Sequence, residues 1–317
     1  MNQRRRRSLF KKRFPLDQCA FYKLKSKKKL STILKASLAN IKSLCDDDRN
    51  YHLVEIEEEF NKLTGKRKKA RQASVPNFFL RKIHSRAHGL LSSIVTPNYA
   101  HGSITARSYV TNALVHVESW EFLTMDIQDF FRSVKKEHVY YFFKDVMQCS
   151  PDVAGILSNL LTYKGALAVG SPVSSLLAMW TCKGMFDRLE SLAIENGLRF
   201  STFVDDLTFS GSELPASLHE QIENVCKRYG FTIRGDKTVF YKGGMPALIT
   251  GVVVVGGKIE ATYSRFRSIR KLSKILSEEG THAVVNGKYA KRSLRGGLLE
   301  ARRIIRVSDS RLQASNI

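Results

Sequence analysis

Two adjacent aspartates, Asp205 and Asp206, interrupt an otherwise apolar and β-prone stretch, residues 201–211. An ionised carboxylate that leaves water needs compensation of several kcal/mol, so a folding chain keeps such a pair only where solvent or a cation reaches it. Mg²⁺ suits this position because it takes oxygen ligands and sits between carboxylates and substrate phosphates. The alternative is a solvated hairpin turn, since Asp is common in turns.

A third aspartate, Asp126, lies in residues 122–131, which we predict to be a strand. Alternation places Asp126 on the face opposite three apolar residues, Leu123, Met125 and Ile127. Carboxylates from two strands can hold two Mg²⁺ ions about 4 Å apart, the arrangement for in-line displacement at phosphorus. Adjacent side chains of an extended chain point to opposite faces. We therefore expect Asp205 to share the main ligation with Asp126, and Asp206 to be peripheral.

These motifs together resemble the palm of reverse transcriptases, and Leu207 to Ser210 are particularly similar to bacterial retron-type enzymes. The resemblance implies an α+β fold: a right-hand polymerase with fingers, an antiparallel-sheet palm and a short helical thumb. It implies a basic N-terminal extension or first helices over residues 1–36, fingers with part of the palm over 37–122, palm over 123–247 and thumb over 248–317. It also adds Ile127 to the metal-binding positions.

The same resemblance suggests residues that contact the incoming deoxynucleoside triphosphate (dNTP). Arg71 is similar to the fingers arginine that contacts the triphosphate, and Lys237 falls near the same group. Phe131 is similar to the aromatic residue that selects deoxynucleotides by crowding the sugar 2′ position. The turn near the nascent base pair is Gly170, Ser171 and Pro172. This sequence departs from the family at two positions, with Val169 where glutamine is common and Arg234 where asparagine is usual.

The turn residues also carry a local prediction of their own. Ser171 is a suitable N-cap and Pro172 suits a first helical position, so we predict a helix from there towards Gly197.

Two further patterns are similar to retron-type enzymes. Asn112 and His116 fit an Asn-Ala-x-x-His motif, and the segment Ile249, Thr250 and Gly251 is a variant of a Val-Thr-Gly motif. In the family the second motif contacts the structured part of the cognate RNA, and we expect all five residues to bind RNA. Residues 252–262 after it predict a β-hairpin with a Gly-Gly turn.

The charge of the chain favours a polynucleotide partner. The net charge is +23, and the excess lies at the two ends. Residues 1–36 hold 13 Lys and Arg against one acid, and residues 261–317 hold 13 against four. Such basic surfaces follow phosphates. Residues 263–276 and 291–305 predict amphipathic helices, and four cations of the first are candidate RNA contacts: Arg267, Arg270, Lys271 and Lys274.

Other features set limits on the class of protein. The basic N-terminus is followed by no apolar secretory core, and no stretch has the length of a membrane span, so we expect a soluble, cytoplasmic protein without a membrane partner. The five cysteines show no zinc spacing and no disulfide framework.

The preferred hypothesis is a retron RNA-directed DNA polymerase that uses two Mg²⁺ ions. By resemblance it copies its cognate structured noncoding RNA into a branched RNA-DNA hybrid, with dNTPs as substrates, and works with an effector protein in defence against phage. A group II intron-like or an abortive-infection reverse transcriptase is an alternative. A catalytically silent RNA-binding protein is the alternative from another class. Three acids on a phosphate-facing surface argue against it, because without Mg²⁺ they would repel the ligand.

Overall fold

The computed structural model describes residues 13–45 and 48–315 of the 317-residue chain. Residues 1–12, which include much of the predicted basic extension, lie outside this part. The helices are α2 (Lys27–Leu34), α3 (Leu38–Cys45), α4 (Phe78–Leu91), α5 (Tyr109–Leu114), α6 (Phe130–Ser133), α7 (Lys136–Tyr141), α8 (Pro151–Leu161), α9 (Ser174–Thr181), α10 (Lys183–Glu195), α11 (Leu218–Arg228), α12 (Tyr263–Glu279) and α13 (Ala290–Ser315). Short 3₁₀ turns are η1 (Leu16–Gln18), η2 (Asp48–Asn50) and η4 (Gly235–Lys237), and η3 (Phe142–Val146) is a π-helical turn.

The strands form five small antiparallel sheets. The central sheet has four strands in the order β6-β7-β5-β8, and a three-stranded sheet has the order β11-β10-β9. The pairs β1-β4, β2-β3 and β12-β13 complete the set. The strands are β1 (Tyr51–Ile56), β2 (Glu59–Asn61), β3 (Lys66–Lys68), β4 (Arg71–Pro76), β5 (Glu121–Asp126), β6 (Arg199–Phe203), β7 (Asp206–Gly211), β8 (Val239–Tyr241), β9 (Ala247–Ile249), β10 (Val252–Val255), β11 (Lys258–Ala261), β12 (Val284–Val285) and β13 (Lys288–Tyr289).

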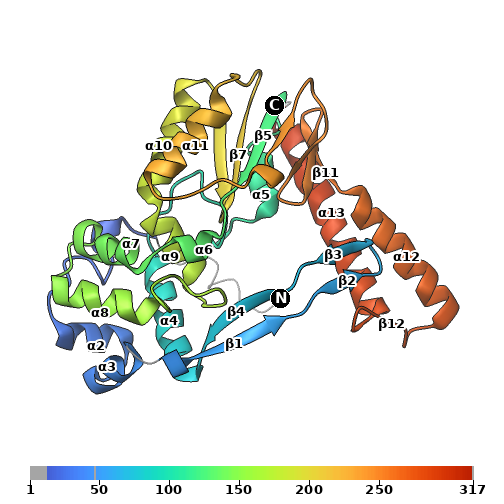
Figure 1. Cartoon of the computed structure of the whole chain (residues 1–317). Coiled ribbons are helices and arrows are strands. Elements are labelled where there is room, and N and C mark those ends of the chain that lie inside the picture. Colours follow the sequence, from blue (N-terminus) through green and yellow to red (C-terminus); the bar gives the residue numbers. More distant parts are fainter. Residues whose placement is uncertain (1–12, 46–47, 316–317) are drawn as a thin grey trace.

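The central sheet confirms the predicted α+β class with an antiparallel sheet. Helices α10 and α11 lie beside β6 and β7 (Figure 1). Leu123, Met125 and Ile127 are buried as the alternation predicts. The predicted strand over residues 122–131 is too long, because β5 ends at Asp126 and the chain turns at Asp129, which has φ +45°, into α6.

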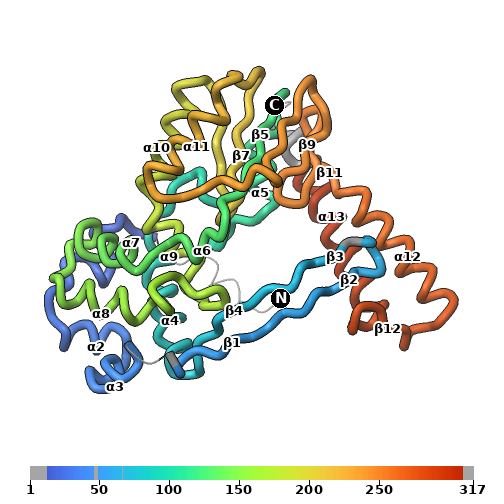
Figure 2. The backbone as a smooth tube through the Cα atoms, viewed as in Figure 1, coloured from blue at the N-terminus to red at the C-terminus, as the bar shows by residue number. Residues whose placement is uncertain are grey.

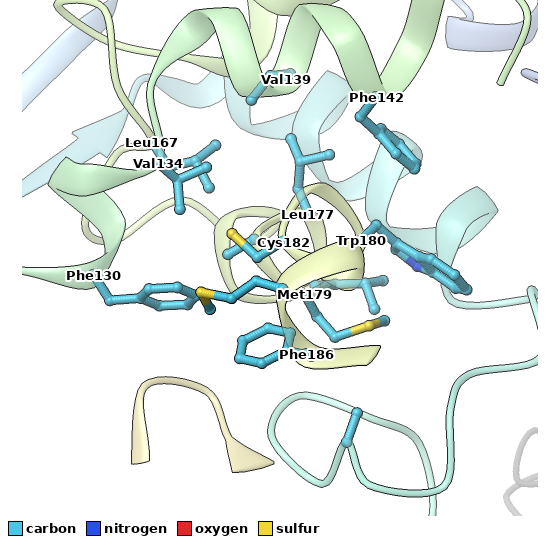
Figure 3. Close-up of a cluster of buried hydrophobic side chains, with 14 of the residues drawn as sticks. Phe130, Val134, Val139, Phe142, Leu167, Leu177, Met179, Trp180, Cys182 and Phe186 are labelled. Carbon is cyan, nitrogen blue, oxygen red and sulfur yellow. The ribbon is translucent and has the colours of Figure 1, made fainter. Parts of the chain in front are cut away.

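The predicted helix from Pro172 to Gly197 is in fact two helices. Helix α9 begins at Ser174, and α10 follows after Cys182, whose φ of −94° and ψ of 8° leave the helical range. Ser171 is not the N-cap, because α9 begins at Ser174 and its N-cap is Val173. The Ser171 hydroxyl accepts from the Val173 amide at 3.4 Å and lies 2.7 Å from Nδ1 of His84. Figure 3 shows the apolar side chains around α9, among them Leu177, Met179 and Trp180, which pack with the α6 and α7 region to form the main core.

The described part of residues 1–36 is not an extension from the fold. Phe21, Leu24 and Leu30 are almost fully buried in the main core, and Phe14 bridges to Ile94. For residues 13–36 this burial contradicts a basic extension, whereas α2 agrees with the alternative prediction of first helices. Apolar residues between the lysines give this segment a face that is buried by packing against α4 and α8.

Residues 51–76 form a long ribbon, called the arm below, in which β1 pairs with β4 and β2 with β3. Figure 2 shows the arm running from α4 across to the C-terminal helices. Its tip contacts them: the side-chain amide of Asn286 donates to Oδ1 of Asn61 at 3.3 Å, and Nζ of Lys271 donates to the Lys62 carbonyl at 3.2 Å. Leu63 packs beside buried Leu272. The arm thus connects the region of α4 with the C-terminal part of the chain, and in the view of Figure 2 it runs below the central sheet.

Residues 247–315 form a C-terminal unit that confirms three predictions. Val255 pairs with Lys258 across Gly256 and Gly257, which both have positive φ, so the predicted Gly-Gly hairpin is present. Helices α12 and α13 cover the two predicted amphipathic segments. The unit rests on α5 and β5 through a second apolar cluster that includes Val110, Phe122 and Ile304. Among the described residues, no helix has both the length and the apolar composition for a membrane crossing.

Candidate functional site

The three aspartates meet at one end of the central sheet. Asp126 is the last residue of β5 and pairs in register with Asp206, the first residue of β7. Asp205 lies in the two-residue turn that joins β6 to β7, and its carbonyl accepts a hydrogen bond of 3.1 Å from the Ile127 amide. The structure therefore brings together the carboxylates that the sequence predicted. The Ile127 side chain is buried, so only its backbone carbonyl could reach a metal ion.

The turn before the aspartates is tightly held. Val204 has φ +65°, a conformation that is strained for a β-branched residue. Gly102 lies directly against this turn, and a Cβ atom there would come within 2.5 Å of Val204. The neighbouring backbone is fixed by a 2.8 Å hydrogen bond from the His101 amide to the Thr202 carbonyl. Gly102 thus allows the close approach that fixes Asp205, a role that no local sequence pattern revealed.

The aspartates face two adjoining hollows. Asp126 and Asp205 line a cleft, called the catalytic cleft below, together with three residues predicted to bind the nucleotide: Arg71, Phe131 and Lys237. Asp126 and Asp206 line a smaller hollow with Thr250 and Gly251. Asp126 lines both hollows, so the expected division, in which Asp205 works with Asp126 and Asp206 is more peripheral, stays a prediction.

The neighbouring cations do not fully offset the burial and mutual repulsion of the carboxylates in this site. Burial raises the pKa of Asp205, with a further contribution from Asp126. Burial together with Asp205 and Asp126 raises the pKa of Asp206 to about 6. Clustered, partly buried oxygens of this kind suit a hard divalent cation.

Two cations already contact one of these carboxylates. Nζ of Lys237 lies 2.8 Å from Oδ2 of Asp126, and Nε of Arg234 lies 3.7 Å from Oδ1. Arg234 also holds Asp236 through two hydrogen bonds, at 2.8 and 3.1 Å. Within the described ranges, no three His, Cys, Asp or Glu side chains are arranged as a ready metal site. The donor set fits Mg²⁺, and Lys237 would compete with such an ion for Oδ2 of Asp126.

The Gly170–Pro172 turn lies against the arm. The Val169 carbonyl accepts a 2.6 Å hydrogen bond from the Ser74 amide, and a Cβ at Gly170 would lie 3.2 Å from Val75. Val169 lines the catalytic cleft. The buried hydroxyl of Ser171 is held by His84, and the prediction that the backbone of this turn lies near the nascent base pair stays a prediction.

Three predicted RNA contacts are buried instead. Asn112 and His116 have no exposed surface, and His116 bridges the hydroxyls of Ser210, at 2.6 Å, and Ser201, at 2.7 Å. The side chain of Ile249 is fully buried as well. Direct contact with RNA through these side chains is therefore wrong. The Asn-Ala-x-x-His motif joins α5 to β6 and β7, and burial of this kind cannot be seen from a spacing that also fits an exposed helix.

The other predicted RNA contacts lie closer to the surface. Thr250 donates to the Tyr109 carbonyl at 3.1 Å and accepts from Asn112 at 3.5 Å, whereas Gly251 is exposed. Three cations of α12 are also exposed, namely Arg267, Arg270 and Lys274. The fourth, Lys271, is partly buried and contacts the arm.

Sequence reasoning did not assign a role to two residues of the catalytic cleft. Asp129 lies in the lining of this cleft. Its position three residues after Asp126 is the sequence feature that could have indicated this placement. Arg234 lies there too, and it is the position where the sequence departs from the usual asparagine. Arg234 adds a cation beside the carboxylates, so the departure changes the charge of the cleft.

Comparison with known proteins gives a consistent set of relatives. The family described as reverse transcriptase (RNA-dependent DNA polymerase) matches residues 62–254. The retron Se72 reverse transcriptase of Salmonella heidelberg (strain 579083-10) is 30% identical over 237 residues, which is 71% of this chain and 62% of the relative. The retron Ec86 reverse transcriptase of Escherichia coli is 24% identical over 183 residues, 57% of each protein. The match thus covers less than two thirds of these relatives.

Proposed function

The chain belongs to the reverse transcriptase family, and from this premise we propose that it is a retron-type RNA-directed DNA polymerase. The observation that carries the proposal is the catalytic cleft, whose lining brings together three carboxylates, four cations and two aromatic rings. In this proposal the arm with its adjoining helices is the fingers, the central sheet is the palm, and the C-terminal unit is the thumb.

Each group in the cleft has a part in nucleotide addition. Asp126, Asp205 and Asp206 hold two Mg²⁺ ions, which when bound activate the attacking hydroxyl and stabilise the leaving pyrophosphate. Arg71 and Lys237 bind the triphosphate, because cations pair strongly with phosphate oxygens. Half-buried Phe131 lies where its ring can crowd the sugar 2′ position, which favours dNTPs.

The substrate RNA is the second part of the proposal. The exposed cations of α12, and exposed Gly251 in the lining of the hollow of Asp206, suit contact with a structured noncoding RNA and the hybrid made from it. The priming group is a 2′ hydroxyl of that RNA, and the product is the branched RNA-DNA hybrid called msDNA. The proposal extends to an effector protein in an anti-phage system.

Expression of the chain with its flanking DNA tests this function. We expect a single-stranded DNA joined to RNA by a bond that a debranching enzyme removes. The double change Asp205→Ala with Asp206→Ala should abolish it, whereas Asp145→Asn, at an exposed acid outside the cleft, should not. DNA synthesis on a primed RNA without any branched product would indicate another class of reverse transcriptase. No incorporation by the purified chain on any template would overturn the polymerase proposal.

A further inference from the structure

A second groove adjoins the catalytic cleft, and we call it the side groove. Its lining comes from β1, β4, the end of α6 and residues 163–169. Gln72, Arg132 and Val169 line both hollows, so the two are continuous. A polymer chain that leaves the catalytic cleft at Val169 therefore enters the side groove.

The side groove is strongly basic. Arg132, Lys135 and Lys164 contribute three exposed cations, and its lining contains no acidic residue. Within the part of the chain that the structure describes, no ion pair engages any of these three side chains. The Lys164 ammonium lies over the Tyr163 ring, 5.4 Å from its centroid, and clustered cations without acidic partners attract phosphates.

The groove is also preorganised. Lys164 and Gly165 form a tight turn with positive φ, closed by two hydrogen bonds between Tyr163 and Ala166 at 2.8 and 3.1 Å. This turn is tied to α7 because the Lys136 amide donates to the Gly165 carbonyl at 2.9 Å. The Tyr163 ring packs on Tyr51 with centroids 4.4 Å apart. The Tyr163 ring and the backbone that carries Lys164 are thus held in place before any ligand arrives.

The side groove also has apolar side chains in its lining, next to the cations. Leu53 of β1 lines the groove and is half exposed, and the half-buried ring of Tyr163 lies in the same lining. Cations that follow a backbone, together with an aromatic face for bases, are the combination that binds single-stranded nucleic acid. A double helix hides its base faces and would not use the ring.

We propose that the side groove binds the single-stranded segment of the template that has not yet been copied. This inference rests on the proposed polymerase function. The template passes the catalytic carboxylates, so its uncopied strand and the finished hybrid must leave the cleft on different sides. Helices α12 and α13, proposed to hold the hybrid, lie on the opposite side of the molecule from α8, whose following turn carries Lys164 (Figure 1).

Equilibrium binding to two template-primer pairs tests the proposal without depending on catalysis. Both pairs share one RNA-DNA duplex; one has a single unpaired template nucleotide, and the other has about ten, enough to fill one single-strand site. We expect the wild-type chain to bind the long overhang about tenfold more tightly, by fluorescence anisotropy at moderate salt. The double variant Lys135→Ala with Lys164→Ala should lose this advantage and bind the short overhang normally. For this variant on the long overhang, the slope of log binding constant against log salt concentration should become shallower by about 1.4, because two phosphate contacts are lost.

Two controls distinguish the loss of charge in the side groove from a disturbed fold and from a general loss of positive charge. Lys135→Arg with Lys164→Arg keeps the cations and should keep the advantage of the long overhang. Lys227→Ala with Lys242→Ala removes two exposed cations outside both grooves and should not change it. Equal weakening of both template-primer pairs by the Lys135 and Lys164 variant would overturn the proposal, as would equal binding of both pairs by the wild-type chain. Failure of the proposed polymerase function would be seen separately, because the wild-type chain would then synthesise DNA on neither template-primer pair.

Discussion

The ammonium of Lys237 forms a 2.8 Å ion pair with Asp126, so one of the three central carboxylates is already engaged by a cation of the protein. The Lys237 side chain is about half exposed, whereas that of Asp126 is 9% exposed, so the lysine can move away while the carboxylate stays. A metal ion that binds Asp126 takes the place of the Lys237 ammonium as the positive partner of this carboxylate. We infer that Lys237 alternates between Asp126 and the phosphates of the nucleotide.

Lys237→Met separates these two roles. Removal of the competing ammonium should lower the Mg²⁺ concentration that half-saturates the site by about threefold, and loss of the phosphate contact should raise the KM for dNTP by about tenfold. Calorimetric titration with Mg²⁺ gives the affinity for the metal. Steady-state kinetics at saturating Mg²⁺ give the KM for dNTP. Lys242→Met is the matched control. Unchanged Mg²⁺ affinity in Lys237→Met would contradict the competition.

Asp206 predicts an unusual dependence of stability on pH. Its pKa is raised from 3.8 to about 6, so the native state binds a proton more readily than the unfolded chain does. Without metal, this residue therefore makes the protein more stable as pH falls from about 6 towards 4. At pH 8, Asp206→Asn should raise the free energy of unfolding by about 2 kcal/mol, because it removes a partly buried and repelled charge.

Urea unfolding in the presence of a chelator measures this effect. Asp236→Asn, at an exposed acid whose pKa is lowered by Arg234, should have the opposite sign and a smaller size. Mg²⁺ should stabilise the wild-type chain more at pH 8 than at pH 5, since protonation of Asp206 competes with the metal. A loss of stability in Asp206→Asn would show that its carboxylate makes favourable contacts instead.

Phe131→Val should weaken discrimination between sugars. The smaller side chain opens space in the catalytic cleft where the 2′ hydroxyl of a ribonucleotide would otherwise meet the ring. We expect the ratio of kcat/KM for dNTP over that for the ribonucleotide to fall by about 100-fold, with a small change for dNTP itself. Single-nucleotide incorporation measures both constants. Phe142→Val, in the core away from the cleft, controls for general loosening. An unchanged ratio would show that another residue selects the sugar.

The sequence allowed good prediction where chemistry and periodicity act locally. Unpaired carboxylates in a strand pattern identified Asp126, Asp205 and Asp206, and the Gly-Gly hairpin and the helical segments after Thr262 follow from turn chemistry and spacing. Contacts between distant segments could not be predicted in this way. The burial of His116 depends on serines 85 and 94 residues away, and Gly102 matters only because the chain folds back on Val204.

The contact between the arm and the C-terminal unit predicts a specific cross-link. Asn61 and Asn286 are hydrogen bonded at 3.3 Å, although they lie 225 residues apart in the sequence. The double variant Asn61→Cys with Asn286→Cys should form a disulfide in mild oxidant, seen as a mobility shift that reductant reverses. Among the described residues no native cysteine forms a disulfide, and four of the five are buried, which limits side reactions. Each single variant is the control. Absence of the cross-link would show that the arm lies apart from the turn between β12 and β13 in solution.

His116 should be a structural residue whose contribution depends on pH. Burial lowers its pKa to about 3, from an ordinary 6.5, so the folded state keeps it neutral while the unfolded chain takes up a proton. Its contribution to stability is complete above pH 6.5 and is lost as pH falls towards 3. His84 and His101, whose pKa values burial lowers to about 4, act in the same direction.

His116→Ala should lower the free energy of unfolding at pH 7.5 by about 3 kcal/mol, because it leaves a cavity and two buried hydroxyls without their partner. It should also flatten the fall in stability between pH 7.5 and 5.5. Chemical unfolding at the two pH values measures both, and the exposed His282→Ala should change neither. RNA affinity should stay within about twofold of wild type at low temperature, since surface contacts with phosphates dominate binding. A large loss of RNA affinity in a stably folded His116→Ala protein would restore the direct RNA contact that its burial rules out.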